Sequence, residues 1–394
     1  MRGHMTHTKR ICTITASVLG LAVVAFSQDN NLPASGGSQI KASDQSVAQN
    51  YWSNDRLANS TSMPLPKLDL PAEVTDNIES PTKSSTKIAP RIFPGTRPTI
   101  GPKDVPQQST SVPVKSQSTT QATDQPHAAS ASLISDIPYN GYQVPNVNMY
   151  PYSAVGKLFF TIPPGASVPA GDYSCVATVF YDSHTVITAR HCIFDFATKI
   201  FYTNFVFFPA YENGPNPAFN NGWNVRYVFT WVGGATSTLD YDVAFVQLAD
   251  AAGFGCNGSS GTPPIWSYTG SLGVWIFGAA SQYNTIMENA LGYPGLNPLN
   301  YSIMYQDTAV SSAYAGGIVQ MANPVDVIAD AGPWIVGLNP GAADDGGNNT
   351  VNASNLVTGL SAGRGSSPLT MYGPAFLTYN VWNLYASYTQ VPCF

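Results

Sequence analysis

Short apolar runs separated by turn residues characterise the chain from Ile137 onward. These runs are rich in Val, Ile, Phe and Tyr and are bounded by Gly, Pro and Asn, a composition that predicts β-strands. The predicted strands lie at 151–160, 175–180, 186–189, 205–208, 225–231 and 243–248 in the first half, and at 273–277, 334–336 and 356–360 in the second. We therefore predict an all-β fold of two six-stranded antiparallel barrels.

The pattern changes at both ends of this region. Residues 381–388 carry apolar and aromatic side chains at helical spacing, which predicts a short C-terminal helix ending before Cys393. Residues 28–135 are dominated by Ser, Thr, Gln and Pro, with too little apolar surface to offset the entropy of ordering the chain. We expect a disordered linker or propeptide over 28–135 and a folded domain over 136–394.

The first residues have the pattern of a targeting segment. Arg2, Lys9 and Arg10 precede an apolar run over 11–26, which predicts a signal peptide, residues 1–27, cleaved after Ser27. The run is short for a membrane span, so we expect a secreted protein with no membrane anchor after cleavage. An uncleaved anchor is the alternative that this pattern leaves open.

Charge separates the tail from the folded region. Residues 28–135 carry nine Lys and Arg against nine Asp and Glu, whereas 136–394 carry five against fourteen. An acidic folded region disfavours nucleic acid as a partner. Five Asn-x-Ser/Thr sequons fit a glycosylated secretory protein. They are at Asn59, Asn257, Asn300, Asn348 and Asn352.

The cysteine count also suits secretion. Removal of Cys12 with the signal peptide leaves an even number of cysteines, as expected in an oxidising compartment. These four allow three pairings, and their spacing favours Cys175 with Cys192 and Cys256 with Cys393. No Cys-x-x-Cys pair occurs, and the region 136–394 holds only two histidines, so we predict no metal site and no cofactor.

One histidine and one aspartate stand out as candidate catalytic residues. His191 lies in the run Thr-Ala-Arg-His-Cys over 188–192, directly after an apolar strand. Asp242 directly precedes the apolar run 243–248, and we prefer it to Asp240. A carboxylate that fixes the tautomer of an imidazole makes that imidazole an effective proton acceptor, so the pair suggests acid–base chemistry. The alternative for Asp242 is an aspartate that only forms a turn at the start of a strand.

These segments resemble the chymotrypsin-like serine peptidases, and most closely the secreted bacterial and fungal branch that includes glutamyl endopeptidases. The resemblance covers roughly 150–394 and extends to the segments 151–155 and 292–295. It implies that His191 is the general base, that Asp242 orients it, and that a peptide or protein ligand occupies the cleft.

The nucleophile motif departs from this family. Where the family has Gly-x-Ser-Gly-Gly-Pro-Trp, the chain reads Ile-Ala-Asp-Ala-Gly-Pro-Trp over 328–334, which places Asp330 at the serine position. Ile328 and Ala329 then fall in the oxyanion region, and Ile328 and Ala331 carry a Cβ where the family has glycine. A second register, through Ala-Gly-Gly at 315–317, lacks a serine too.

The family's specificity pocket has a counterpart later in the chain. Ser361, Ala362 and Gly363, after the strand 356–360, resemble the segment that lines this pocket. The family's glutamate-specific members place a histidine in the pocket, and none occurs over 355–365, so glutamate specificity is not supported.

Three hypotheses follow. The first is a secreted peptidase homologue that is catalytically inactive and acts as a binding or regulatory module. The second is an active endopeptidase with its nucleophile in another register, with Ser311, Ser312 and Ser361 as candidates. The third is a surface or matrix protein that acts through its tail.

Overall fold

The structure is a computed structural model in which 13 stretches of the chain are described. They are 33–65, 67–68, 90–100, 142–181, 184–219, 222–233, 239–250, 263–284, 286–294, 302–322, 330–340, 354–365 and 370–390. The predicted signal peptide, residues 1–27, and the whole of 101–141 lie outside them, as do Cys256 and Cys393.

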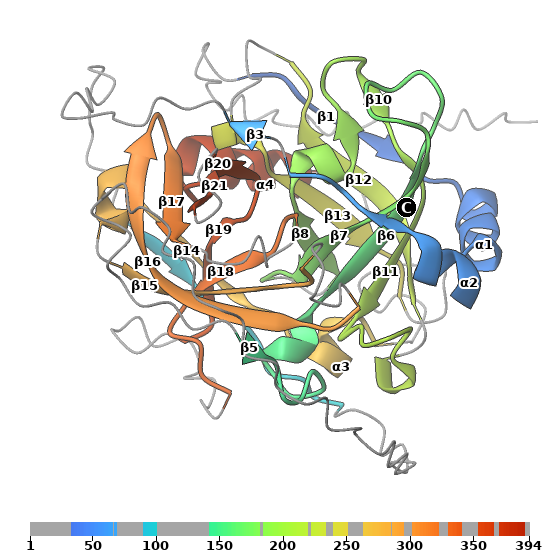
Figure 1. The fold of residues 1–394 in the computed structure, drawn as a ribbon, viewed down its shortest axis with the longest axis horizontal. Coiled ribbons are helices and arrows are strands. Elements are labelled where there is room, and N and C mark those ends of the chain that lie inside the picture. The colour runs from blue at the N-terminus through green and yellow to red at the C-terminus, as the bar shows by residue number, and fades with distance from the viewer. Residues whose placement is uncertain are drawn as a thin grey trace, which may run out of the picture. The chain divides into compact units, whose positions relative to one another are not determined.

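Six antiparallel strands form the first barrel (Figure 1). Their order around the ring is β12, β11, β6, β7, β8 and β13, and pairing of β13 with β12 closes it. The strands are β6 (Val155–Ile162), β7 (Gly171–Val179), β8 (Thr185–Thr188), β11 (Thr203–Pro209), β12 (Trp223–Trp231) and β13 (Ala244–Leu248). Most of their side chains are buried on both faces, which explains why these segments are nearly continuous apolar runs rather than alternating ones.

A second sheet contains the other barrel. Its strands are β14 (Gly273–Ile276), β15 (Ile286–Gly292), β16 (Tyr305–Ala315), β17 (Ile318–Ala322), β18 (Pro333–Val336), β19 (Leu356–Leu360), β20 (Gly363–Gly365) and β21 (Thr370–Pro374), with β3 (Lys67–Leu68), β4 (Arg91–Phe93) and β5 (Tyr142–Gln143) added at its edges. The strands β19, β18, β15, β16, β17 and β21 follow one another by antiparallel pairing, and a bridge from Gly359 to Ala375 closes the ring.

The predicted all-β fold with two barrels is therefore confirmed. The sheets are not purely antiparallel, because β14 pairs with β19 in parallel, as do β2 (Thr61–Ser62) with β7 and β3 with β20. The smaller elements are β9 (Phe194–Asp195), β10 (Ile200–Phe201), α3 (Trp266–Thr269) and the short helical turns η1 (Tyr152–Ala154), η2 (Arg190–Cys192), η3 (Pro217–Phe219), η4 (Leu239–Tyr241) and η5 (Ala280–Tyr283).

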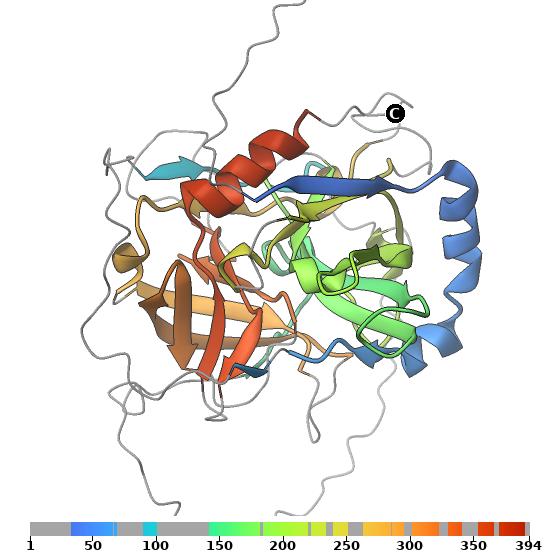
Figure 2. The same cartoon turned by 90° about the horizontal axis from the view of Figure 1, so that it is seen from above.

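Part of the expected disordered tail is structured. Strand β1 (Ser35–Gln39) pairs antiparallel with β12, followed by helices α1 (Ala42–Tyr51) and α2 (Asn54–Asn59) along the barrel (Figure 2). Trp52 and Leu57 are buried in the barrel's core cluster, and Trp52 Nε1 donates to the carbonyl of Asn204 at 2.5 Å. These few large apolar residues, rather than the average composition of 28–135, attach the segment, so the expectation of disorder is wrong for 33–65.

Glycine is required where β1 docks. A Cβ at Gly37 would lie 2.3 Å from the carbonyl oxygen of Val228, so the two backbones can approach this closely only without a side chain.

The short C-terminal helix is confirmed. A π-helical turn, η6 (Thr378–Trp382), leads into α4 (Asn383–Tyr388). Tyr385 and Tyr388 contact Phe245 of β13, and the hydroxyls of Tyr388 and Thr185 are 2.8 Å apart. In the described parts of the chain, no helix is long and apolar enough to cross a membrane.

Candidate functional site

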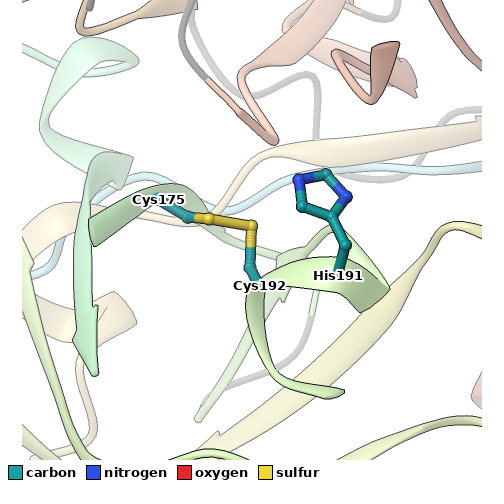
Figure 3. Close-up of side chains that lie close together, drawn as sticks. All are labelled: Cys175, His191 and Cys192. Carbon is teal, nitrogen blue, oxygen red and sulfur yellow. A yellow bond between two sulfur atoms is a disulfide. The ribbon is translucent and has the colours of Figure 1, made fainter. Parts of the chain in front are cut away.

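The loop after β8 presents His191. Strand β8 ends at Thr188, and the chain turns through the single 3₁₀ turn η2, which holds His191 at its centre. Cys192, the next residue, forms a disulfide with Cys175 of β7, with a Cα–Cα distance of 6.1 Å (Figure 3). The predicted pairing of these two cysteines is therefore present, and it ties the histidine loop to the neighbouring strand.

Asp242 holds one side of this histidine. Its Oδ2 is 2.6 Å from Nδ1 of His191, and its Oδ1 accepts the backbone N–H of His191 at 3.0 Å. Asp242 lies just before β13, which pairs with β8, so neighbouring strands bring the two loops together. Asp240 contacts the hydroxyl of Tyr379 instead.

Asp330 lies on the other side of the imidazole. Its Oδ1 is 3.7 Å from Nε2 of His191, too long for a hydrogen bond, and the side chain is 1% exposed. The backbone carbonyl of Asp330 accepts the N–H of Val176 in β7 at 2.8 Å. Asp330 therefore comes from the second barrel but is fastened by its backbone to the first.

Burial and neighbouring charges shift the pKa values of His191, Asp242 and Asp330. Burial opposes protonation of His191, but the charge and hydrogen bond of Asp242, together with Asp330, outweigh it and raise the pKa of His191 to about 10. Burial would raise the pKa of Asp242, yet His191 holds it below its usual value. Burial raises the pKa of Asp330, and His191 opposes this only in part. At neutral pH the imidazole is therefore protonated between two carboxyl groups.

The carboxyl group of Asp330 is buried without hydrogen bonds, in the described part of the chain, that would offset its loss of hydration. Neither of its carboxylate oxygens has a hydrogen bond from any described residue, and Nε2 of His191 has none either. The charge of Arg364 in β20 favours the ionised form of Asp330, an influence that our reading of the sequence missed. An arginine three residues beyond Ser361 was the only available signal.

The backbone after Asp330 has an unusual conformation. Ala331 is fully buried at φ +71°, in the left-handed region that favours glycine. Its N–H donates to the carbonyl of Ser361 at 2.7 Å, and the N–H of Ser361 donates back to the carbonyl of Gly332 at 2.8 Å. Ala331 therefore adopts a left-handed backbone conformation that glycine adopts more easily. Ile328 and Ala329, the predicted oxyanion region, lie outside the described residues.

The predicted pocket segment is next to this turn. Ser361 and Ala362 are buried, and Gly363 begins β20. The Ser361 hydroxyl accepts a hydrogen bond from Nε1 of Trp334 at 3.0 Å. The two other candidate nucleophiles also have partners elsewhere: the Ser311 hydroxyl donates to the carbonyl of Tyr283, and the Ser312 hydroxyl accepts from Gln320.

The site does not have the donor set of a metal centre. Cys175, His191 and Cys192 place one sulfur or nitrogen each within 4.8 Å of one another. Both sulfurs are joined in the disulfide, so neither is a thiolate that could bind a metal ion (Figure 3). Of the five sequons, the structure describes only Asn59, at the exposed end of α2.

Known proteins similar to this chain were found among solved structures but not among sequence families. No family model matches the chain, and no curated protein sequence matches it significantly. The solved structures similar to it include a thermostable serine protease AL20 from an extremophilic microorganism (24% identity, 60% of this chain and 98% of that one, TM-score 0.45). They also include protease Anisep from Arthrobacter nicotinovorans (22%, 61% and 96%, 0.46) and a Glu endopeptidase (13%, 64% and 97%, 0.45).

Proposed function

We propose that the protein is a secreted homologue of chymotrypsin-like serine peptidases that keeps the acid–base pair but has lost the nucleophile, and that it binds peptide or protein ligands without cleaving them. One observation carries the proposal. The group that faces Nε2 of His191 is the buried carboxyl of Asp330, in the place where acyl transfer needs a hydroxyl.

The protonation state of His191 supports inactivity. A general base must be free of its proton near the working pH to accept one from a nucleophile. With a pKa of about 10, the imidazole is already protonated at neutral pH and is held as an ion pair by Asp242. Attack on an amide by Asp330 would form an anhydride and would require oxyanion stabilisation, and the sequence places Ile328 and Ala329 where the family has its oxyanion donors.

The other candidate nucleophiles give little support to an active enzyme. Ser311, Ser312 and Ser361 hydrogen-bond to groups other than His191. The alternative of an active endopeptidase therefore requires a nucleophile other than these three serines. The third candidate, a matrix protein acting through its tail, is weakened because 33–65 contribute to the barrel's packing.

The decisive test is labelling with a fluorophosphonate probe, which reacts with activated serines. We expect no labelling of the purified protein. Labelling should appear in a triple variant with Asp330→Ser, Ala331→Gly and Ile328→Gly, because these changes supply the hydroxyl and the glycine backbone. Adding His191→Ala to this variant should abolish labelling, since loss of the base costs several orders of magnitude.

The outcomes separate the candidate functions. Labelling of the unmodified protein that is lost with His191→Ala would establish an active peptidase and overturn the proposal. Labelling of the triple variant alone would show that His191 and Asp242 remain correctly placed around a missing nucleophile. For secretion, the corresponding check is the N-terminal sequence of protein recovered from culture medium, expected to begin after Ser27.

A further inference from the structure

The docked N-terminal helices enclose a cavity of about 1000 Å³ against the first barrel. One wall comes from α1 and α2, and the other comes chiefly from β11 and the loop that follows it (Figure 1). This volume is at the upper end of the range for small-molecule pockets, about 300–1,000 Å³. The described residues that line the cavity include none of the candidate site, so the two are separate.

The floor of the cavity is apolar. It consists of five buried side chains, those of Trp52, Leu57, Val206, Phe208 and Tyr211. Three of them are aromatic, and Nε1 of Trp52 is already bonded to the carbonyl of Asn204. The floor therefore offers a ligand apolar surface rather than hydrogen-bond donors.

The rim of the cavity is polar and exposed. Gln49 on α1, Asn54 on α2 and Asn213 after β11 line it with amide side chains, which both donate and accept hydrogen bonds. Of the described lining residues, Asp55 alone is charged, so a phosphate or carboxylate ligand would meet no cation there. The rim therefore suits a neutral ligand with many hydroxyl or amide groups.

Both walls are fixed by contacts outside the cavity. On the helix side, Asp172 of β7 accepts a hydrogen bond from the hydroxyl of Tyr51 at 2.7 Å and another from Nη1 of Arg56 at 2.8 Å. On the loop side, the N–H of Asn213 donates to the carbonyl of Ser302 at 2.8 Å. A ligand would therefore enter a preformed space and would order few groups on binding.

The barrel side of the cavity has no open strand edge. Strand β11 pairs with β6 along one edge and with β12 along the other. A polypeptide that binds by adding a strand needs unpaired backbone groups along such an edge. Side chains rather than backbone therefore have to recognise the ligand of this cavity.

A motif for saccharide attachment adjoins the rim. The sequon Asn59-Ser60-Thr61 begins at the last residue of α2. Asn59 is exposed, and its Nδ2 donates to the backbone carbonyl of Asp55, one helical turn earlier, at 2.7 Å. Asp55 and Ala58 both line the cavity. A glycan attached to Asn59 would therefore begin beside the rim.

We propose that this cavity binds a neutral saccharide that carries hydroxyl and acetamido groups. The apolar faces of the sugar rings would pack on the floor, and the polar groups would bond with the amides of the rim. Two sources supply this chemistry, the protein's own glycan at Asn59 and a free saccharide. The inference goes beyond the proposed function, because the cavity is separate from the candidate site.

The test starts with the full chain produced in the bacterial periplasm, where the disulfide forms and no N-glycan is added. The probe is N,N′-diacetylchitobiose, followed by saturation-transfer NMR. We expect Gln49→Trp to weaken binding at least about tenfold, because the indole occupies the mouth of the cavity. Asn50→Trp changes the next exposed helix residue, which does not line the cavity, and should bind the probe as the unmodified protein does.

A second probe tests the class of ligand. Chitobiose without its acetyl groups carries ammonium groups in mildly acidic buffer, and we expect it to bind more weakly than the acetylated form. Tighter binding of this cationic probe would show a cation site at Asp55 and would overturn the proposal. Failure of the unmodified protein to bind N,N′-diacetylchitobiose, or equal binding by the Gln49→Trp and Asn50→Trp proteins, would also overturn it.

Protein made in eukaryotic cells identifies the source of the saccharide. If the glycan on Asn59 fills the cavity, the glycosylated protein should not bind the probe, and Asn59→Gln from the same cells should bind it. If both proteins bind the probe equally well, the site serves a free saccharide, and either result supports the proposal. No step involves hydrolysis, so an active enzyme would refute the proposed function without affecting these measurements.

Discussion

The two barrels contribute unequal halves to the candidate site. The first barrel supplies His191 and Asp242 as a tightly bonded unit, with a 2.6 Å contact between side chains and a second bond to the backbone. The second barrel supplies Asp330, whose nearest approach to the imidazole is 3.7 Å and whose carboxylate oxygens have no hydrogen bond from the described residues. In the first half, Asp242 bonds both Nδ1 and the backbone N–H of His191, whereas the carboxyl of Asp330 in the second half is buried without such a bond.

This difference indicates what each half does. A buried pair joined by short hydrogen bonds orients its members and stabilises the fold around them. A buried carboxyl without hydrogen bonds costs stability, because desolvation of the charge is not offset. The first barrel thus holds an oriented imidazole–carboxylate pair, while the second barrel contributes a buried carboxyl that stabilises the fold poorly. The predictions below test this asymmetry.

The largest expected effect comes from matched substitutions in the two halves. Asp242→Asn should lower the free energy of unfolding by about 3–5 kcal/mol, because it leaves the His191 cation without its closest partner. Asp330→Asn should change it by less than about 1 kcal/mol, since the carboxyl it removes has no hydrogen bond to lose. Chemical denaturation of both variants measures the difference. Equal losses would show that the two carboxyl groups are equivalent.

A pH series should separate the two states of His191. The folded pKa of about 10 lies above the ordinary value of 6.5, so the stability contributed by His191 is fully present below pH 6.5 and is lost as the pH rises toward 10. The difference in unfolding free energy between the unmodified protein and His191→Gln should therefore shrink by several kcal/mol over this window.

The comparison with His191→Gln is needed because Lys157 also titrates between pH 7 and 10.5, and its effect on the free energy of unfolding has the opposite sign. Burial lowers the pKa of Lys157 to about 7, so its contribution to stability rises with pH between 7 and 10.5. Measured alone, the unmodified protein combines both effects. If the difference between the unmodified protein and His191→Gln stayed constant from pH 6.5 to 10, the ion pair with Asp242 would not exist in solution.

The disulfide should matter less than Asp242. Cys175 and Cys192 are separated by 17 residues, and a closed loop of that length stabilises the fold by about 3 kcal/mol in the chain-entropy model. The double variant Cys175→Ala/Cys192→Ala should lose about this amount in thermal or chemical unfolding. Reduction of the disulfide in the unmodified protein should lower its free energy of unfolding by the same amount as the double substitution. If reduction left the free energy of unfolding unchanged, the pairing of Cys175 with Cys192 would be contradicted.

The smallest expected effect concerns two buried alanines, one beside each half of the site. Ala331 has φ +71°, whereas Ala189, just before η2, has φ −77°, and both are fully buried. Changing either to glycine removes a methyl group and adds flexibility to the unfolded chain. Only at Ala331 does the change also relieve left-handed strain, so Ala331→Gly should be less destabilising than Ala189→Gly by about 1–2 kcal/mol. Equal losses in denaturant unfolding would show that the turn is unstrained.

Short-range patterns predicted the continuous apolar strands of both barrels well. The runs 225–231 and 243–248 correspond to β12 and β13, and 356–360 coincides with β19. In each case the strand is buried among apolar neighbours, so its own composition carries the information. His191 and Asp242 could be singled out for the same reason, because each directly adjoins such a strand.

Prediction was weaker where strands are polar or short. β15, β16 and β17 were not singled out, since residues such as Glu288, Asp307 and Gln320 interrupt their apolar pattern. Strands β2 and β3 have two residues each and carry no periodicity at all. The average composition of 28–135 also concealed Trp52 and Leu57, the residues that dock its first part on the barrel.

The sequence by itself determined the all-β class and the C-terminal helix, and it favoured the pairing of Cys175 with Cys192 and singled out Asp330, because local composition and spacing carry this information. Only the tertiary structure decided that Asp330 faces His191 without a hydrogen bond and that the segment 61–68 binds both barrels. Those features depend on which distant backbone edges remain unpaired after the barrels close, and no short stretch of sequence contains that information.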